Sequence, residues 1–410
     1  MPQPPLTGLR VLELTNYMAG PFCAMVLADL GADVIKVENP NGGDMSRANP
    51  PFVHGEGAGF MALNRNKRSV AINLKHPEGR DLLLALAEKA DVLIENFRPG
   101  TTRDLGVHYE AVRERNPSII YAAVSAFGQT GPYGPRAGLD LIVQGMSGLM
   151  SITGEEGGPP IKPGAPIADL TAALYTANAI QAAYIHKLKT GEGQFIDVSL
   201  FESAVALEAW ETSGYLANGE VPKPLGSAHR TSAPYQAFRT SEGYVTLGAT
   251  SPNNWRACCV VLGIEHLERD GRFETNAVRK ANQDELAALI EAITVTQSSD
   301  HWYRKFEEAG VPCGILNRID QVVADPHLIE RGFVVDLPHT SAGMVRAMGS
   351  PMHLAATPVR MERAGPLLGE HTDEILGTLL GLDAVAIDRL VSAGAVARAA
   401  SRLIITKAGF

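Results

Sequence analysis

Short apolar runs alternate with longer, partly polar segments over residues 1–125. Helical patterns at 22–30 and 77–89 stand between these runs, and Pro77 suits the first turn of its helix. The apolar runs have the length and composition of buried strands, and they lie at residues 9–14, 33–38, 69–74, 91–95 and 119–125. This alternation predicts an α/β fold with a doubly wound parallel sheet of Rossmann type, in which ligands lie beyond the carboxyl ends of the strands.

The longest helical pattern covers residues 170–188 and contains neither Pro nor Gly. A Gly- and Pro-rich stretch precedes it, and Asp169 stands at the junction. We expect the free N–H groups and the dipole of the helix start to keep this carboxylate ionised. Two interpretations stay open: Asp169 caps the helix, or it is an anionic nucleophile that meets a reactive acyl group where little water is present.

The second half of the chain has a different pattern. Gly, Pro and Ser are frequent over residues 222–232, and we expect a domain boundary there. A smaller α+β domain should follow, with a hairpin at 235–249 that turns at Glu242-Gly243. The other predicted elements are strands at 314–316, 333–337 and 353–361 and helices at 201–216, 255–262, 283–295, 300–308, 369–379 and 384–393.

Length and composition indicate a globular protein of two domains, with 410 residues, 45% hydrophobic and 20% charged. The net charge of −9 argues against a nucleic-acid partner. No run is long and apolar enough to span a membrane, and the N-terminus lacks a signal-peptide pattern, so a cytoplasmic protein is expected. No metal site is expected, because neither the H-E-x-x-H pattern nor metal-ligand spacing is found among Cys23, Cys258, Cys259 and Cys313.

The loops at the predicted strand ends indicate a phosphorylated ligand. Residues 15–21 lack the G-x-G-x-x-G fingerprint, which argues against bound NAD, yet Ala19-Gly20-Pro21 leaves room for a phosphate or adenine beside backbone N–H groups. Residues 96–98 add an amide, an aromatic face and a guanidinium, and residues 64–75 form a second basic cluster. A tight turn and ordinary solvated charges are the alternatives to this interpretation.

Eight segments spread over the chain carry a resemblance to known proteins: VLELTNYMAGPFCAMVLADLGADVIKVE, NRNKRSVAINLKHPEG, ADVLIENFRPG, FGQTGPY, PIADLTAALYTA, KTGEGQFIDVSL, GVPCGILN and PLLGEHTDEIL. They resemble the class III CoA-transferase family, which includes formyl-CoA transferases, carnitine-CoA transferases and 2-methylacyl-CoA racemases. The resemblance implies coenzyme A thioesters and a free carboxylic acid as substrates, and an interlocked homodimer whose two chains thread through one another. It also implies a large Rossmann-like domain formed by residues 1–222 and 330–410 and a small α+β domain at 226–328.

The resemblance also implies roles for individual residues. The aspartate nucleophile of the family matches Asp169. Relatives carry a basic residue one place after Arg103, where this chain has Asp104, so Arg103 is expected to act in its place. Asn39 replaces an arginine of some relatives. The other residues that match the family's CoA site are Met18, Ala19, Leu74, Lys75, Asn96, Phe97 and Arg98.

A transferase of this family is expected to form a mixed anhydride and then a CoA thioester on Asp169. Leu139 stands where racemases carry a proton-exchanging histidine and where oxalate-type enzymes carry a tyrosine, which disfavours both reactions. A 2-methylacyl-CoA racemase and a non-catalytic CoA-binding protein remain the alternatives. We expect succinyl-CoA as donor and a dicarboxylic acid as acceptor. The basic side chains of Arg47, Arg136, His229 and Arg230 lie in loops that could hold the second carboxylate, and the alternative is that each is an ordinary solvated charge.

Overall fold

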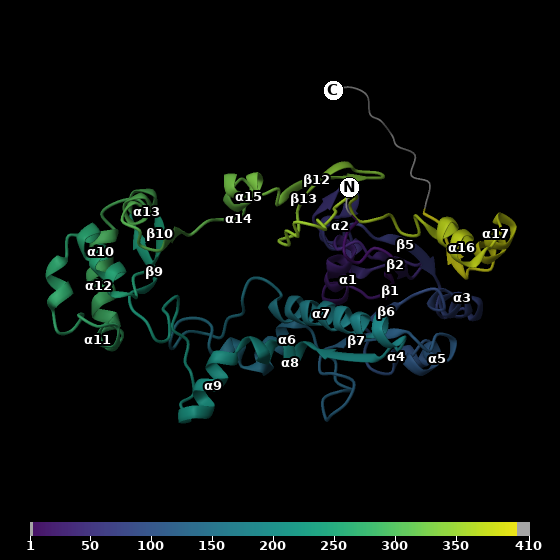
Figure 1. Cartoon of the computed structure of the whole chain (residues 1–410), viewed down its shortest axis with the longest axis horizontal. Coiled ribbons are helices and arrows are strands. Elements are labelled where there is room, and N and C mark those ends of the chain that lie inside the picture. Colours follow the sequence, from purple (N-terminus) through teal and green to yellow (C-terminus); the bar gives the residue numbers. More distant parts are fainter. Residues whose placement is uncertain (1–2, 400–410) are drawn as a thin grey trace, which may run out of the picture. The chain divides into compact units, whose positions relative to one another are not determined.

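The computed structural model describes residues 3–399, which divide into two compact units (Figure 1). Unit 1 contains residues 3–149, 163–213 and 326–399, and unit 2 contains residues 150–162 and 214–325. These bounds differ from the predicted domains. Residues 150–162 and 214–222, which were predicted in the large domain, belong to unit 2, and residues 326–328, which were predicted in the small domain, belong to unit 1.

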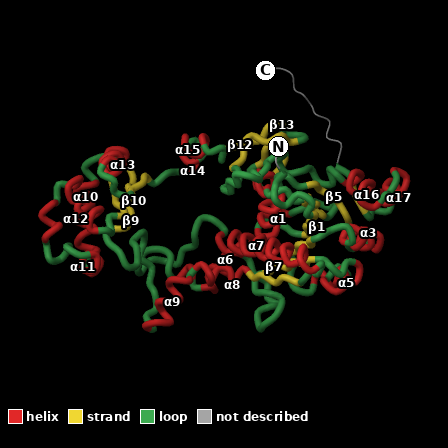
Figure 2. Tube along the Cα trace, in the orientation of Figure 1, coloured by secondary structure: helices red, strands yellow, loops and turns green. Residues whose placement is uncertain are grey.

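Unit 1 is built on a seven-stranded sheet in the order β14-β5-β2-β1-β6-β7-β8 (Figure 2). All neighbouring strands are parallel except β14 and β5, which confirms the predicted parallel sheet. From central β1 the chain goes first to β2 and β5 on one side and then to β6 on the other, so the switch point lies between β1 and β6. The strands are β1 Arg10–Leu14, β2 Asp33–Glu38, β5 Arg68–Ile72, β6 Val92–Glu95, β7 Ile120–Ser125, β8 Phe195–Ser199 and β14 Val396–Ala397.

Helices cover both faces of this sheet, so successive residues of its central strands are buried on both sides. Helices α1 (Ala19–Asp29) and α7 (Ile167–Thr190) cover one face, and their alanines let them pack closely on the strands. No helix among the described residues, α7 included, is long and apolar enough to cross a membrane. The opposite face is covered by α3 Pro77–Ala87, α5 Tyr109–Arg115, α16 Thr372–Leu380 and α17 Ala384–Ser392 (Figure 1).

Two predictions in unit 1 are wrong. Residues 201–216 do not form one helix, because the backbone of Glu208 leaves the helical region and separates α8 (Leu200–Leu207) from α9 (Ala209–Asn218). Residues 353–361 form no strand; β12 (Val334–His339) pairs instead with β13 (Gly343–Met348). The remaining elements are β3 Phe52–Val53, β4 Glu56–Gly57, α2 Ala58–Leu63, α4 Thr101–Asp104, α6 Asp140–Ser147, α15 Pro326–Glu330 and the 3-10 turns Met45–Ala48 and Leu149–Ser151.

Unit 2 is an α+β unit with its own core. Antiparallel strands β9 (Tyr235–Thr240) and β10 (Gly243–Gly248) form the predicted hairpin, which turns at Ser241-Glu242, one residue before the expected place. Within residues 3–399, no group of three or more His, Cys, Asp or Glu side chains is arranged to hold a metal ion. The other elements are β11 Cys313–Ile315, α10 Pro252–Leu262, α11 Asn276–Ala281, α12 Gln283–Thr294, α13 Ser299–Glu308, α14 Ile319–Val322 and the 3-10 turn Glu265–Arg269.

Candidate active site

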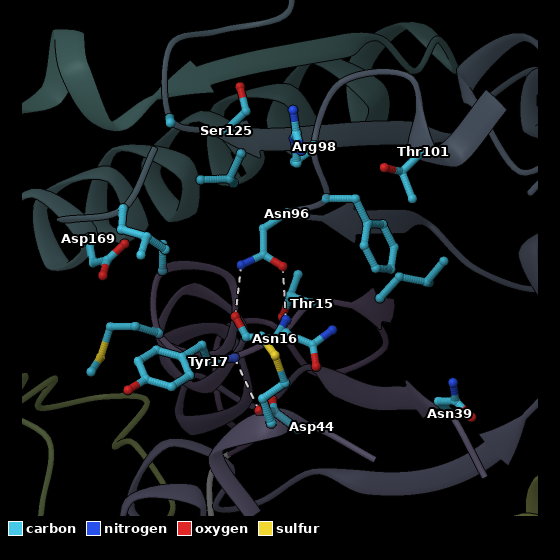
Figure 3. A pocket seen from close by; sticks show the side chains of 18 of the residues that line it. Thr15, Asn16, Tyr17, Asn39, Asp44, Asn96, Arg98, Thr101, Ser125 and Asp169 are labelled. Carbon is cyan, nitrogen blue, oxygen red and sulfur yellow. Dashed lines mark hydrogen bonds between the residues drawn. The ribbon is translucent and has the colours of Figure 1, made fainter. Parts of the chain in front are cut away.

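A cavity of about 1280 Å³ lies in unit 1 at the carboxyl ends of β1, β2, β5, β6 and β7 (Figure 3). This is the sheet edge that the strand–helix alternation predicted, and it includes the β1–β6 switch point. The starts of α1 and α7 complete its wall. The structure brings together at this cavity eight of the residues singled out from the sequence, Met18, Ala19, Leu74, Lys75, Asn96, Phe97, Arg98 and Asp169.

Arg103 does not line the cavity, contrary to the expectation that it would take the place of the family's basic residue. Its neighbours Thr101 and Leu105 reach the cavity, whereas the Arg103 side chain is 68% exposed and lies 3.5 Å from the carboxylate of Glu110. The helix α4 is a single turn, so successive residues point in different directions, and position 103 faces solvent. Lys75 and Arg98 are the cationic residues that line this cavity among the described residues.

The basic side chains proposed for the second carboxylate are also placed differently. Arg47 does not line the cavity: its guanidinium donates to both oxygens of Glu38, at 2.7 Å each, and lies 3.6 Å from the ring centre of Phe60. Arg136 lies over the ring of Tyr133 at 4.7 Å, outside the cavity lining.

His229 and Arg230 belong to unit 2, and the His229 ring stacks on Tyr235 at 4.8 Å. The cavity of unit 1 therefore contains none of these four side chains. Their basic character was visible in the sequence, but the partners that occupy Arg47 and Arg136 come from the fold.

The turn after β1 forms one wall of the cavity and is held from two sides. The side-chain amide of Asn96 pairs with the backbone of Asn16, accepting its N–H at 2.8 Å and donating to its carbonyl oxygen at 2.8 Å (Figure 3). Asp44 accepts the N–H of Tyr17 at 3.1 Å. Asp44 and Tyr17 were not singled out from the sequence. The only available signal was that both lie in loops at predicted strand ends.

The start of α7 has an unexpected cap. Asp169 lies in the first turn of the helix, three residues after the N-cap residue Pro166, and no hydrogen bond from the described residues contributes to the pKa shift of its carboxylate. Instead, Oδ1 of Asp140 accepts the N–H groups of Ala168 at 3.0 Å and of Asp169 at 3.4 Å. Gln144 donates to the other oxygen of Asp140 at 2.6 Å. The interpretation of Asp169 as a helix cap is therefore wrong, and Asp140, which sequence reasoning missed, has that role.

Comparison with known proteins decides the family. The model of CoA-transferase family III matches residues 6–372. The chain belongs to CoA-transferase family III. It is 43% identical over 384 residues to a succinate–glutarate CoA-transferase of Agrobacterium fabrum, a match that covers 92% of this chain and 96% of that protein. It is 40% identical over 393 residues to the human succinyl-CoA:glutarate CoA-transferase, covering 96% of this chain and 90% of the human one.

A solved structure has the same fold. The crystal structure of a CAIB/BAIF family protein from Brucella suis matches with a TM-score of 0.84 and 38% sequence identity, covering 92% of this chain and all of that one. These findings confirm the resemblance read from the segments and identify the protein as a CoA-transferase that acts on CoA thioesters. The exposed cations and the polar loop backbone at the cavity fit the anionic phosphates of such a substrate.

The protonation of Asp169 in this family III enzyme differs from the sequence expectation. Burial, and to a smaller extent the negative charge of Asp140, raise the pKa of Asp169 to about 7. The helix start does not keep the Asp169 carboxylate fully ionised, because Asp140 has taken the N–H groups and the positive end of the helix dipole. When it does ionise, Asp169 is a poorly solvated anion, which makes it a stronger nucleophile than a carboxylate in water.

Proposed function

We propose that this CoA-transferase moves CoA between succinyl-CoA and a second dicarboxylic acid, with Asp169 as the nucleophile. The observation that carries the proposal is the position of Asp169: a half-buried carboxylate with no capping role that lines the same cavity as the predicted CoA-binding residues. The choice of substrates is supported by the names of the two relatives, which act on succinyl-CoA or succinate and on glutarate.

In the first half-reaction, an oxygen of ionised Asp169 attacks the thioester carbonyl carbon of succinyl-CoA. The C–S bond breaks, CoA leaves as the thiolate, and a mixed anhydride of Asp169 and succinate remains. The thiolate then attacks the Asp169 carbonyl carbon, which releases succinate and leaves an aspartyl-CoA thioester. No proton is taken up and no redox change occurs, so Asp169 needs no general base.

In the second half-reaction, the carboxylate of the acceptor acid attacks the aspartyl thioester and displaces CoA thiolate. The thiolate attacks the acyl carbon that came from the acceptor, which forms the new acyl-CoA and frees the Asp169 carboxylate. The anhydride and thioester intermediates both react with water, so the half-buried setting of Asp169 protects them.

The predicted CoA-binding residues would hold the carrier during this exchange. Lys75 and Arg98 supply positive charge for phosphates, and Phe97 offers an aromatic face for the adenine or the pantetheine arm. Met18 and Ala19 place the backbone at the start of α1 against the cavity, where N–H groups favour an anion. Leu74 adds apolar wall beside Lys75.

The test is trapping of the intermediate. Native enzyme incubated with succinyl-CoA and hydroxylamine should carry a hydroxamate on Asp169, detected by peptide mass spectrometry. Asp169→Ala should abolish transfer and still bind coenzyme A, whereas Asp33→Ala, which removes a carboxylate outside the cavity, should keep activity. Transfer by the Asp169→Ala variant, or an adduct on another side chain, would refute the assignment.

The racemase alternative is tested in the same preparation. Leu139 lines the cavity and has no exchangeable proton, which argues against a two-base proton transfer at this position. Incubation of a 2-methylacyl-CoA in deuterated water, without any acceptor acid, should leave the α-carbon unlabelled. Incorporation of deuterium there would favour the racemase, and binding of coenzyme A without exchange of labelled CoA would favour a non-catalytic protein.

We also propose that the enzyme works as an interlocked homodimer. The support is an exposed apolar surface on α6 and α7, of the kind that partner subunits cover. Its side chains are between 47% and 69% exposed, and they are Leu141, Ile142, Leu174, Tyr175, Ile185 and Leu188. Light scattering should give the mass of two chains. Two differently tagged dimers should not exchange subunits when mixed, because linked chains separate only after unfolding; rapid exchange would exclude interlocking.

A further inference from the structure

The turn between β1 and α1 has a backbone conformation that is unfavourable on its own. Tyr17 has a φ of 73°, in the left-handed region that residues with a side chain rarely adopt. A Cβ added at Gly20 would lie 2.3 Å from Cβ of Thr15, so the turn is also tightly closed. Such conformations persist where the surrounding structure holds them, and this one forms a wall of the cavity.

Asp44 fixes the strained residue directly. Its Oδ1 accepts the N–H of Tyr17 at 3.1 Å and also accepts the N–H and hydroxyl of Ser46, at 2.8 and 2.7 Å. Figure 3 shows this bond from Asp44 to Tyr17, with the Tyr17 ring on the same side of the view as Asp169. The backbone conformation at residue 17 therefore decides where the Tyr17 side chain enters the cavity.

A buried cation holds Asp44 in turn. Nζ of Lys36 lies 2.9 Å from Oδ2 of Asp44, 2.8 Å from Glu13 and 2.9 Å from the carbonyl oxygen of Thr15, and all three charged side chains are fully buried. Burial alone would raise the pKa of Asp44, but Lys36 and the hydrogen bonds from Ser46 outweigh it and lower the pKa to about 2. The carboxylate is therefore ionised whenever the protein is folded near neutral pH.

The same cluster reaches the far end of the turn. The second oxygen of Glu13 lies 2.8 Å from Nζ of Lys67, and Lys67 donates to the carbonyl oxygen of Pro21 at 2.9 Å. Lys67 is also fully buried. Glu13, Lys36, Asp44 and Lys67 thus contact the turn at its start, at its strained residue and at its end. Buried charges are costly to place, so their convergence on a single turn indicates a positional role rather than general stabilisation.

We propose that Asp44, anchored on Lys36, is a positioning residue of the CoA site that holds the Tyr17 turn in the shape that admits the substrate. The proposal rests on the proposed function, because it takes the cavity as the CoA site. Asp44 acts through the backbone of Tyr17. Its loss lets residue 17 relax out of the left-handed region and moves the wall formed by Asn16, Tyr17 and Met18.

The experiment is a double-mutant cycle between residues 44 and 17, read as the Kd for coenzyme A by calorimetry. Asp44→Ala should raise this Kd about tenfold, because it removes the acceptor of the Tyr17 N–H. Asp44→Asn keeps an acceptor oxygen and should stay within about threefold of the native enzyme. In a Tyr17→Gly background the Asp44→Ala change should also cost less than about threefold, because glycine adopts positive φ without strain.

The control is Asp29→Ala, which removes another buried carboxylate, paired with Arg65 at 2.6 Å outside the cavity lining. It should lower the melting temperature and leave the Kd for coenzyme A unchanged. An unchanged Kd in folded Asp44→Ala, or the same loss with Gly at residue 17, would overturn the proposal. If the native enzyme bound no coenzyme A, the proposed function would fail. The same double-mutant cycle, read as the change in unfolding free energy, would then test the contact between Asp44 and Tyr17. Absence of coupling between the two residues would overturn the positioning role of Asp44.

Discussion

Asp140 and Asp169 meet at the first turn of α7, and it is Asp140 that accepts the helix N–H groups, including that of Asp169 itself at 3.4 Å. The two carboxylates therefore differ in function. Asp140 accepts the hydrogen bonds and lies at the positive end of the helix dipole. Asp169 is partly buried and lies near the negative charge of Asp140, and together these two effects raise the pKa of Asp169 to about 7. In the proposed role of nucleophile, an Asp169 carboxylate that is hard to ionise would be poorly solvated and reactive once ionised.

The first prediction concerns the pH dependence of transfer. In the proposed mechanism the ionised form of Asp169 attacks, so kcat/KM should rise with pH through about 7 and then level off. Below the pKa, kcat/KM should fall about tenfold for each pH unit. The measurement is the initial rate of transfer from succinyl-CoA between pH 5 and 9. An acidic limb of the pH profile with a midpoint near pH 4, the pKa of an ordinary aspartate, would contradict the effect of burial on Asp169.

The second prediction concerns Asp140. Asp140→Asn retains an oxygen that can accept the N–H groups of Ala168 and Asp169 but removes the negative charge that raises the pKa of Asp169. The acidic limb of the pH profile should therefore move to lower pH. Asp197→Asn is the matched control, because Asp197 also accepts a backbone N–H, from Gln129 at 2.9 Å, and does not line the cavity. Equal shifts in both variants would contradict the role of Asp140.

The third prediction is a gain in stability when the nucleophile is removed. The pKa of Asp169 is higher in the folded protein than in the unfolded chain, so the folded state binds the extra proton between about pH 4 and 7. Wild-type stability should therefore fall as pH rises through this range. The Asp169→Asn variant cannot ionise at this position and does not lose this stability. Its free energy of unfolding relative to the wild type should therefore increase from pH 4 to 7 and be higher by on the order of 2 kcal/mol at pH 8. Thermal unfolding at pH 4 and pH 8 measures the difference, and an equal effect at both values would contradict it.

The fourth prediction compares the two cationic residues that line the cavity, Lys75 and Arg98, with Arg103, which does not line it. Lys75→Met and Arg98→Met should each raise the Kd for coenzyme A about tenfold or more, since charged hydrogen bonds to phosphate would be lost. Arg103→Met should leave the Kd unchanged, because Arg103 faces solvent beside Glu110. Titration at low and high salt should show that the native Kd rises with salt and that each cavity variant loses part of that dependence. A tenfold effect at Arg103 would instead place that side chain in the site.

Much of the cavity could be predicted from the sequence, because it consists of loops at strand ends. The strand runs and the loops after them are local features, and the parallel sheet brings the carboxyl ends of its strands to one edge. For this reason Met18, Leu74, Asn96 and Asp169 line one cavity although they are distant in sequence. Family resemblance then supplied the CoA chemistry, which the residue pattern alone limited to a phosphorylated ligand.

The pairing of charges could not be predicted in the same way. Arg47 was expected to hold a substrate carboxylate, but Nε and Nη2 of its guanidinium donate to the two oxygens of Glu38. Asp140 caps a helix that starts 27 residues later in the chain, and nothing in the local pattern links the two. Each of these contacts depends on which side chain the folded backbone brings within about 3 Å.

The sequence by itself determined the layered α/β fold, the sheet edge that holds the site and the acidic residue at the start of α7. Those features follow from the periodicity of hydrophobic residues and from the order of the strands, which can both be read from the sequence. The tertiary structure alone decided the protonation of Asp169, the cap by Asp140 and the burial of Lys36 with Asp44 beneath the Tyr17 turn. Desolvation and charge pairing depend on distance in space, so they become defined only when the chain has folded.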